Sequence, residues 1–448
     1  MLRGTHFLLL APLALMPAQG QESNADLVRQ ISELRGLVEA LQTRVSQLEK
    51  QVPAAAKPAA ALAAVPQSNV TPQPPDTAPG TTINVLVDGY YGYNFNAPIG
   101  RANRLRAYDV SSNSFSLNQA ALVVENAADP EKGKRWGARL DLQWGQATQT
   151  LQGNPLNEPR PEIYRAVFQA YGTYVIPVGS GLTVDFGKWA SSLGIEGNYT
   201  KDQMNYSRSY WFNFLPFYHT GVRASYKFND WMTGNYWVTN GTEQTEAFNG
   251  FKDELAGAVI QPRKNLSWTL NYYHGQEHPD VIFYPYGGAP PNLPDLQGVP
   301  FQAIPNPPTG RLHIVDTYAT WQTTPKLTLA GEADWVLERL YLTSAPDRAA
   351  GGAGYAQYQL SDKLSLAARG EYLSDRGALF SGVSQLLKEA TLTAKYKFGE
   401  GFEMYGEWRR DFSNHPYFYT STPGVLSNQQ NTATVGLVWW FGPKQGVW

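Results

Sequence analysis

The feature that most constrains this chain is a succession of two-faced segments that runs from residue 83 to residue 441. Segments of about ten residues carry an apolar or aromatic side chain at every second position, which is the period of a β-strand with two different faces. About sixteen such segments lie near 83–95, 115–126, 135–145, 163–175, 181–188, 218–228, 231–241, 252–261, 265–275, 311–322, 326–338, 351–360, 363–374, 387–398, 401–411 and 431–441. Single-chain bacterial outer-membrane barrels have an even number of strands. The pattern therefore predicts an all-β transmembrane fold, an antiparallel up-and-down β-barrel of about 16 strands.

The connections between these segments are alternately short and long. Tight turn sequences such as Asn229-Asp230 and Gly399-Glu400 join every second pair of segments. The other connections are longer, up to the run from 276 to 310. Outer-membrane barrels have short periplasmic turns and long external loops, so both ends of the barrel are expected to face the periplasm.

The first part of the chain follows other patterns. Residues 1–20 combine Arg3, an apolar stretch and a small-residue exit, which predicts a secretory signal peptide cleaved before Gln21. Residues 53–82 are rich in Ala, Pro, Thr and Gln and predict a semi-extended linker. Beyond the N-terminus no run of about 20 apolar residues occurs, so any membrane span must consist of strands. The expected domains are a signal peptide (1–20), a coiled coil (21–52), a linker (53–82) and a barrel (83–448).

The coiled coil is predicted from a heptad pattern within residues 24–52. Its seam consists of Leu27, Ile31, Leu34, Val38, Leu41, Val45, Leu48 and Val52. Leu at d and mostly β-branched residues at a would alone favour a parallel dimer. However, Arg44, Val45, Leu48 and Glu49 resemble a trimerisation motif in which Arg and Glu bracket the apolar seam, and a bidentate Arg–carboxylate pair between helices gives it a physical basis. We therefore expect a homotrimer, with dimer and monomer left open.

Composition excludes several classes of function. The chain has no cysteine, which rules out a lipid-anchored cysteine, disulfides, zinc sites of the cysteine type and cysteine nucleophiles. The 36 Lys and Arg residues balance 38 Asp and Glu residues, so no nucleic-acid partner is expected. His274 and His278 are four residues apart, but they leave a strand for a loop, where this spacing does not form a metal site. Since no nucleophile elbow or phosphate loop is present either, we expect no enzyme activity, no cofactor and no metal.

The polar phase of each strand should face the lumen, because lipid offers no partner for a charge. In 139–144, for example, Leu140, Leu142 and Trp144 are expected to face lipid. The charges expected to line the lumen are Asp88, Arg139, Asp141, Arg165, Asp185, Arg223, Lys227, Glu332, Asp334, Arg369, Glu371, Lys395, Lys397, Glu403, Glu407 and Arg409. Side chains cannot fill a barrel of about 16 strands, so the pattern predicts an aqueous pore.

One long connection, from 189 to 217, carries sequence motifs of a known family. These motifs are Phe186-Gly187-Lys188, Leu193-Gly194-Ile195-Glu196, Asn205-Tyr206-Ser207-Arg208-Ser209, Pro216-Phe217 and His219-Thr220-Gly221. With them, residues 83–441 resemble the OmpL-like β-barrel porins of bacterial outer membranes, most strongly over 184–241. The resemblance implies a passive outer-membrane channel and says little about the solute. The coiled coil and linker resemble those of other porin groups, including anion-selective ones.

This connection is the third long loop, which in many porins folds into the barrel and narrows it. We therefore expect Glu196, Lys201, Asp202 and Arg208 at a constriction, where charges on opposite walls would select solutes by size and charge. The alternative is that they are solvated loop charges.

The predicted function is an outer-membrane porin of a Gram-negative cell, embedded in outer-membrane lipid and passing small hydrophilic solutes or ions. The coiled coil is expected to lie in the periplasm. The alternative function is an envelope tether in which the coiled coil contacts peptidoglycan and pore activity is secondary. Phe441 and Trp448 are both candidates for the terminal aromatic residue that the insertion machinery reads.

Overall fold

The computed structural model describes residues 80–152, 158, 160–284, 295–296, 299–444 and 447–448. The chain divides into two units, Met1–Gln73 and Pro74–Trp448, and all described residues belong to the second. The predicted signal peptide and coiled coil, with 53–79 of the predicted linker, lie outside the described residues and stay predictions.

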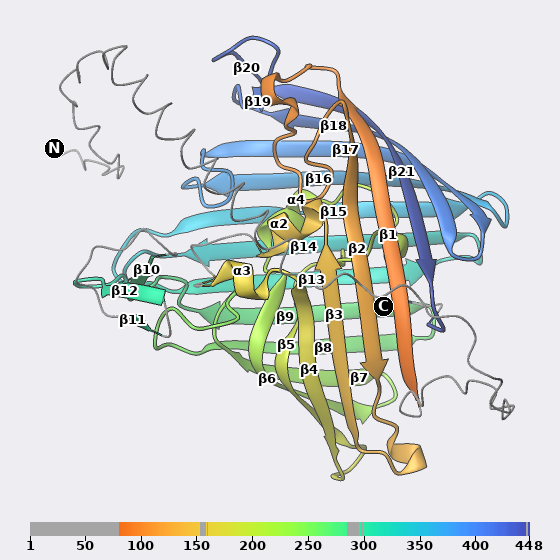
Figure 1. Ribbon diagram of the computed structural model, residues 1–448, viewed down its shortest axis with the longest axis vertical. Coiled ribbons are helices and arrows are strands. Elements are labelled where there is room, and N and C mark those ends of the chain that lie inside the picture. Colours follow the sequence, from red (N-terminus) through yellow and green to blue (C-terminus); the bar gives the residue numbers. More distant parts are fainter. Residues whose placement is uncertain (1–79, 153–157, 159, 285–294, 297–298, 445–446) are drawn as a thin grey trace, which may run out of the picture. The chain divides into compact units, whose positions relative to one another are not determined.

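In the described part of the chain, sixteen antiparallel strands close into a barrel (Figure 1). They are β1 (Thr81–Asn94), β2 (Ser114–Asn126), β3 (Trp136–Trp144), β4 (Val167–Ile176), β5 (Leu182–Ala190), β6 (Tyr218–Asn229), β7 (Met232–Thr239), β8 (Asp253–Arg263), β9 (Leu266–Gly275), β13 (Leu312–Gln322), β14 (Leu327–Glu338), β15 (Asp347–Gln359), β16 (Leu364–Arg376), β17 (Gln385–Gly399), β18 (Phe402–Ser413) and β21 (Gln429–Phe441). Each pairs with the next in this order, and β21 pairs with β1, where Phe441 lies opposite Val85. The predicted barrel of about 16 strands is confirmed.

The alternation of short and long connections is also confirmed. The long loops are named here L1 (95–113), L2 (145–166), L3 (191–217), L4 (240–252), L5 (276–311), L6 (339–346), L7 (377–384) and L8 (414–428). The turns at the opposite end have two to five residues, with two at 230–231, 264–265 and 400–401, except for the turn at 127–135, which is about as long as the shortest loops.

The connections contain the remaining short elements. These are η1 (Ile99–Arg101), η2 (Pro130–Lys132), α2 (Gln146–Gln152), α3 (Pro161–Tyr164), η3 (Thr200–Asp202), α4 (Tyr210–Phe214), β10 (Val281–Phe283), β11 (Asp295–Leu296), β12 (Val299–Ala303), β19 (Phe418–Tyr419) and β20 (Leu426–Ser427). Strands β10, β12 and β11 pair within L5, and β19 and β20 pair within L8. Within the described ranges, no helix is long and apolar enough to cross a membrane.

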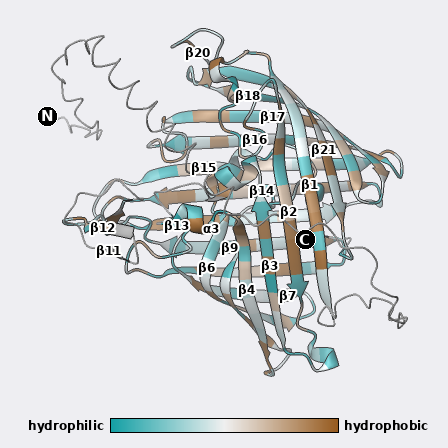
Figure 2. Cartoon of the chain, viewed as in Figure 1, coloured by the Kyte–Doolittle hydropathy of each residue, from teal (hydrophilic) through white to brown (hydrophobic). Residues whose placement is uncertain are grey.

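The two faces of the strands separate as the alternation predicted. In β3, Trp136 and Trp144 are 58% and 50% exposed on the outside, while Arg139 and Asp141 are buried on the inside. Figure 2 shows hydrophobic and hydrophilic residues following one another along the strands. This separation is physically required, because the outer face meets hydrocarbon and the inner face does not.

Candidate functional site: the third external loop and the lumen wall

Loop L3 is held on one side of the lumen by strands β9, β13 and β14. Asn271 of β9 donates to the backbone oxygen of Ser192 at 2.9 Å. The backbone N–H groups of Gly194 and Ile195 donate to carboxylates of β13 and β14, each at 3.1 Å. Since L3 connects β5 to β6, these bonds already place its first part across the barrel interior.

The later part of L3 is held by β1 and β18. Tyr206 donates its hydroxyl to Asp88 of β1 at 2.7 Å and its backbone N–H to Glu407 of β18 at 2.6 Å. Gly436 of β21 makes room for the Tyr206 ring, because a Cβ at this glycine would lie 2.2 Å from a ring carbon. The loop therefore bonds to well-separated parts of the inner wall.

Helix α4, which follows the later anchor along the chain, packs on an apolar part of the wall. Ser209 caps the helix by accepting from the Phe212 N–H at 2.9 Å. Trp211 and Leu215 are buried in a cluster with inward residues near the external ends of the strands, namely Trp237, Leu255, Tyr273, Leu312, Ile314, Val336, Leu373 and Leu387. The prediction of a polar inner phase throughout missed this inner apolar patch. The signal was present, since Val336 and Leu373 continue the inner phase of Asp334 and Glu371.

Glu196 and Arg208 hold the folded shape of L3. The Glu196 carboxylate accepts from the Ser209 N–H at 2.6 Å and from Arg369 at 2.7 Å. The Arg208 guanidinium is fully buried and donates to backbone oxygens of Gly197, Tyr206 and Asn198. Neither residue is a solvated loop charge, and both are used to fix the loop on itself and on β16.

Lys201 and Asp202 form an ion pair at 2.7 Å beside the end of the described chain. The Trp448 ring lies 4.5 Å from the Lys201 ammonium, and its backbone N–H donates to Asp202 at 3.2 Å. Burial lowers the pKa of Lys201. Trp448 thus contacts L3, whereas Phe441 ends β21 with 63% of its surface exposed on the outer face.

Most of the predicted lumen charges lie on the inner wall. The buried ones are Asp88, Arg139, Asp141, Asp185, Glu332, Asp334, Arg369, Glu371, Glu407 and Arg409. Arg223, Lys395 and Glu403 are half-buried on the same face. Lys227 and Lys397 are exposed, and each lies at the turn end of its strand, β6 or β17.

The placement of Arg165 on the wall was wrong. Arg165 follows α3 in L2, before β4 begins at Val167, and it is exposed and paired with Glu162 at 2.9 Å. The predicted strand 163–175 started too early because Pro161 occupies the first turn of a short helix, a position that proline favours.

A network of buried ion pairs connects β16, β17 and β18 to the loops. Arg369 bonds to Glu389 at 2.9 Å as well as to Glu196. Asp411 accepts from Arg409 at 2.8 Å and from Arg106 of L1 at 2.6 Å. The sequence patterns did not single out Glu389, Asp411 or Arg106. The two acids continue the inner phase of their strands, but nothing local marks Arg106 as the partner of Asp411.

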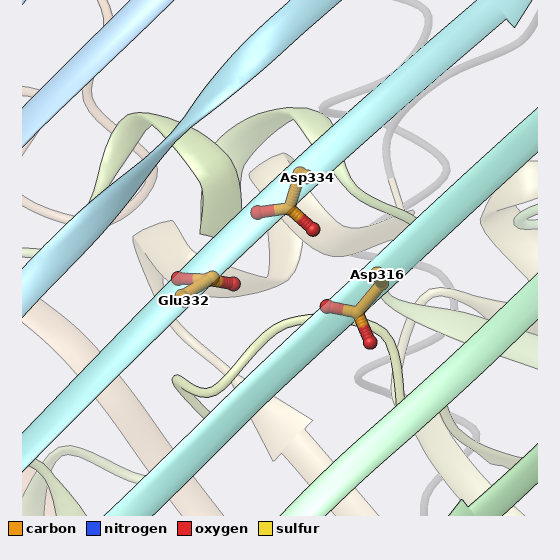
Figure 3. A group of neighbouring side chains, drawn as sticks. All are labelled: Asp316, Glu332 and Asp334. Atoms are coloured by element: carbon orange, nitrogen blue, oxygen red, sulfur yellow. The ribbon is translucent and has the colours of Figure 1, made fainter.

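A second group of inner acidic residues has no basic partner within the described part of the chain. Asp316 of β13 and Glu332 and Asp334 of β14 bring carboxylate oxygens within 4.8 Å of one another, and Figure 3 shows the three groups turned toward a common space. Asp316 and Asp334 are direct cross-strand partners. Among the described residues, no donor bonds to either carboxylate oxygen of Asp334. Carboxylates in this arrangement are the ligands that divalent cations prefer, so these three residues could hold one; the absence of a metal stays a prediction.

Comparison with known proteins identifies the family. The sequence profile described as "Putative beta-barrel porin-2, OmpL-like" matches residues 80–441. Among curated proteins, no sequence matches this chain significantly.

Three of the solved structures that match this chain are as follows. OmpT of Vibrio cholerae is 9% identical with a TM-score of 0.49, covering 81% of this chain and 97% of its own. The anion-selective porin from Comamonas acidovorans is 10% identical with a TM-score of 0.49, covering 81% and 99%. The outer-membrane channel DcaP of Acinetobacter baumannii is 12% identical with a TM-score of 0.48, covering 81% and 97%.

The family assignment depends on the sequence profile, which spans every strand of the barrel. Porins are non-enzymatic channels, which agrees with the prediction that this protein is not an enzyme. The chain therefore belongs to the OmpL-like family of β-barrel porins.

Proposed function

We propose that this porin is a water-filled outer-membrane channel for passive diffusion of small hydrophilic solutes or ions, and that L3 forms its constriction. The observation that carries the proposal is the anchoring of L3 at both ends. Its first part bonds to Asp316 and Glu332, and its later part bonds to Asp88 and Glu407. A loop fixed at opposite sides of a lumen sets the width of the path past it.

The distribution of charge around L3 supports selection by charge as well as by size. Carboxylates without a basic partner lie on β13 and β14, while Arg369 and Arg409 lie on β16 and β18. Because both arginines are paired with carboxylates, the acidic groups of β13 and β14 are the unbalanced charges, and such an asymmetry across a lumen discriminates between ions. Reversal potentials under a salt gradient measure the sign of the selectivity.

The test is single-channel conductance of the purified protein in planar bilayers. We expect stepwise openings from the wild type. The double variant Asp88→Asn, Glu407→Gln weakens the later anchor and should give larger and noisier openings. Glu131→Gln in the exposed periplasmic turn is the control and should conduct as wild type. A folded barrel that never conducts would refute the open channel.

We further propose that a signal peptide exports the protein and that it assembles as a homotrimer through a periplasmic coiled coil at 21–52. The support is the heptad seam with Arg44 and Glu49. OmpT of Vibrio cholerae is described in a trimer form. Light scattering of the full chain and of a chain without 21–52 tests this, since only the former should have three times the protomer mass.

A tether is the second candidate function, favoured by the spacer between the heptads and the barrel. In this case the coiled coil contacts peptidoglycan. Deleting 21–52 should then weaken envelope cohesion while the conductance per barrel stays unchanged. Unchanged cohesion would remove this candidate.

A further inference from the structure

A cavity of about 440 Å³ lies on the external side of L3, and we call it the outer cavity. It is lined by L3 from Asn213 to Phe217, by the external ends of β13 and β14, and by parts of L2, L4, L5 and L7. Its size is in the range of sites that hold small organic ligands. Because it lies between the external loops and L3, a solute arriving from outside can reach it before passing the constriction.

One side of the outer cavity is apolar and aromatic. The rings of Phe214 in L3 and Phe380 in L7 stack with centroids 4.9 Å apart and an interplanar angle of 17°. Both rings are only half-buried. Leu312, Ile314 and Val336 continue this surface along the strands. Burial of a ligand's apolar body against this wall favours binding, because apolar surface is removed from water.

The other side of the outer cavity is acidic. Glu243 of L4, Glu277 of L5 and Glu338 of β14 line it, and all three are half-buried. Among the described lining residues, none is Lys, Arg or His.

Amide donors hold two of these carboxyl groups in place. Glu243 accepts from the Phe217 N–H at 3.3 Å, and Glu277 accepts from the Thr242 N–H and the Gln244 amide, each at 2.9 Å. Amide donors favour the ionised form of a carboxylate, whereas burial raises the pKa of Glu243 to about 7 and that of Glu277 well above its usual range, so the negative charge offered to a ligand increases with pH.

The nearest basic groups have other contacts. The Lys188 ammonium lies 3.8 Å from the centre of the Tyr218 ring, and its charge acts on Glu158 as well as on Glu243. His278 lies 3.7 Å from Glu338 but also bonds to the backbone oxygen of Arg339 at 2.8 Å. One lysine and one histidine do not balance the acidic groups around the outer cavity.

We propose that the outer cavity binds amphipathic organic cations, in which an ammonium or guanidinium group is joined to an aromatic or aliphatic body. The body lies against Phe214, Phe380 and the apolar ends of β13 and β14. The cationic group faces the glutamates and is also attracted to the aromatic faces. The role of the outer cavity in solute uptake rests on the proposed channel function, whereas the binding of a cation in the cavity does not.

The experiment uses the full chain, folded in detergent, and titrates it calorimetrically with benzyltrimethylammonium. This probe has a fixed positive charge and an aromatic body, and benzenesulfonate is the matched anion. We expect binding of the cation and none of the anion. Glu243→Gln and Glu338→Gln should each weaken binding about threefold to tenfold. Phe380→Leu keeps an apolar wall without a π face and should weaken it about twofold to fivefold.

Controls separate this proposal from the channel itself. Glu131→Gln makes the same charge change at the periplasmic end and should leave binding unchanged. Heat-modifiable mobility on gels establishes that each variant is folded. Equal binding of cation and anion, or unchanged affinity in all three cavity variants, would overturn the proposal. Potassium chloride conductance of the same samples is read separately. Conductance without cation binding refutes only the outer cavity as a site, and cation binding without conductance refutes only the channel.

Discussion

The two walls that hold L3 use opposite electrostatic arrangements. On β16 and β18, Arg369 and Arg409 are each paired with carboxylates, one of which, Glu196, belongs to the loop. On β13 and β14, Asp316 and Glu332 accept from loop amides, and no ion pair involves either of them among the described residues. The first wall is compensated internally, and the second holds the loop through neutral donors and brings three carboxyl groups together without a basic partner in the part of the chain that the structure describes.

This difference shows two ways in which buried acidic and basic groups can hold a loop in position. A buried ion pair contributes little net stability, but removing one partner is costly because the other charge stays buried. A carboxyl group whose oxygens accept from neutral donors does not depend on a basic partner to satisfy them. We infer that the β16–β18 wall fixes L3 and that the β13–β14 wall sets the local field.

The largest effect is expected from Arg369→Met, which breaks the compensated wall. Glu196 and Glu389 would then be buried without their shared partner, which costs about 3–5 kcal/mol. We expect a lower unfolding temperature and unstable, larger openings in planar bilayers. Arg165→Met, on the exposed surface of L2, should change neither quantity. Wild-type stability of Arg369→Met would show that the ion pairs do not hold the loop.

The next largest effect concerns the packing of Tyr206 of L3 against Gly436 of β21. In Gly436→Ala the new methyl group would overlap the Tyr206 ring and push it away from Asp88, at a cost of about 1–3 kcal/mol. A methyl group added at Gly406, on the neighbouring strand β18, would meet no other atom within 4 Å, so Gly406→Ala is the matched control. Thermal unfolding of the two variants, side by side, measures the difference. Equal stability would mean that Tyr206 can move without loss.

On the β13–β14 wall, removal of the charge of Asp334 should increase the stability of the barrel, the opposite of the effect of Arg369→Met. Asp334→Asn removes one of two like charges that lie directly across from each other and should stabilise the barrel by about 1 kcal/mol. Asp316→Asn removes acceptor capacity used by Gly194 and Asn271 and should destabilise it. Chemical unfolding in detergent measures both. Destabilisation by Asp334→Asn would show that this carboxyl is compensated by a bound proton or cation.

The same contrast explains which parts of the molecule were predictable from sequence. Strand number, loop alternation and the inner position of residues such as Asp141 and Arg409 follow from a local period of two, so the sequence carries them directly. The contact of Arg106 with Asp411 joins residues 305 positions apart, and no local pattern encodes it. The buried state of Glu196 and Arg208 likewise depends on how L3 folds inside a closed barrel. Periodicity assigns a residue to a face, but it does not say what crosses the lumen in front of that face.

The outer cavity extends the comparison to a carboxylate that titrates near neutral pH. Burial raises the pKa of Glu243 in L4 to about 7, although the Phe217 N–H and the Lys188 charge act in the opposite direction. Glu277 also lines the cavity, and Glu158 competes for Lys188. A raised carboxyl pKa means that Glu243 is mostly neutral at pH 6 and mostly ionised at pH 8.

Binding of benzyltrimethylammonium should therefore tighten about threefold to tenfold between pH 6 and pH 8. The free energy of unfolding changes in the opposite direction and falls as the pH rises, because the folded state holds the Glu243 proton more tightly than the unfolded chain does. Its contribution is present at low pH and is lost as the pH rises through the folded pKa. Glu243→Gln should flatten the binding profile while Glu131→Gln leaves it unchanged, which calorimetry at matched ionic strength measures. If the affinity of Glu243→Gln still changes steeply with pH, the titrating group is another residue of the cavity, such as Glu277. The outer cavity would then remain a binding site, but Glu243 would not control its pH dependence.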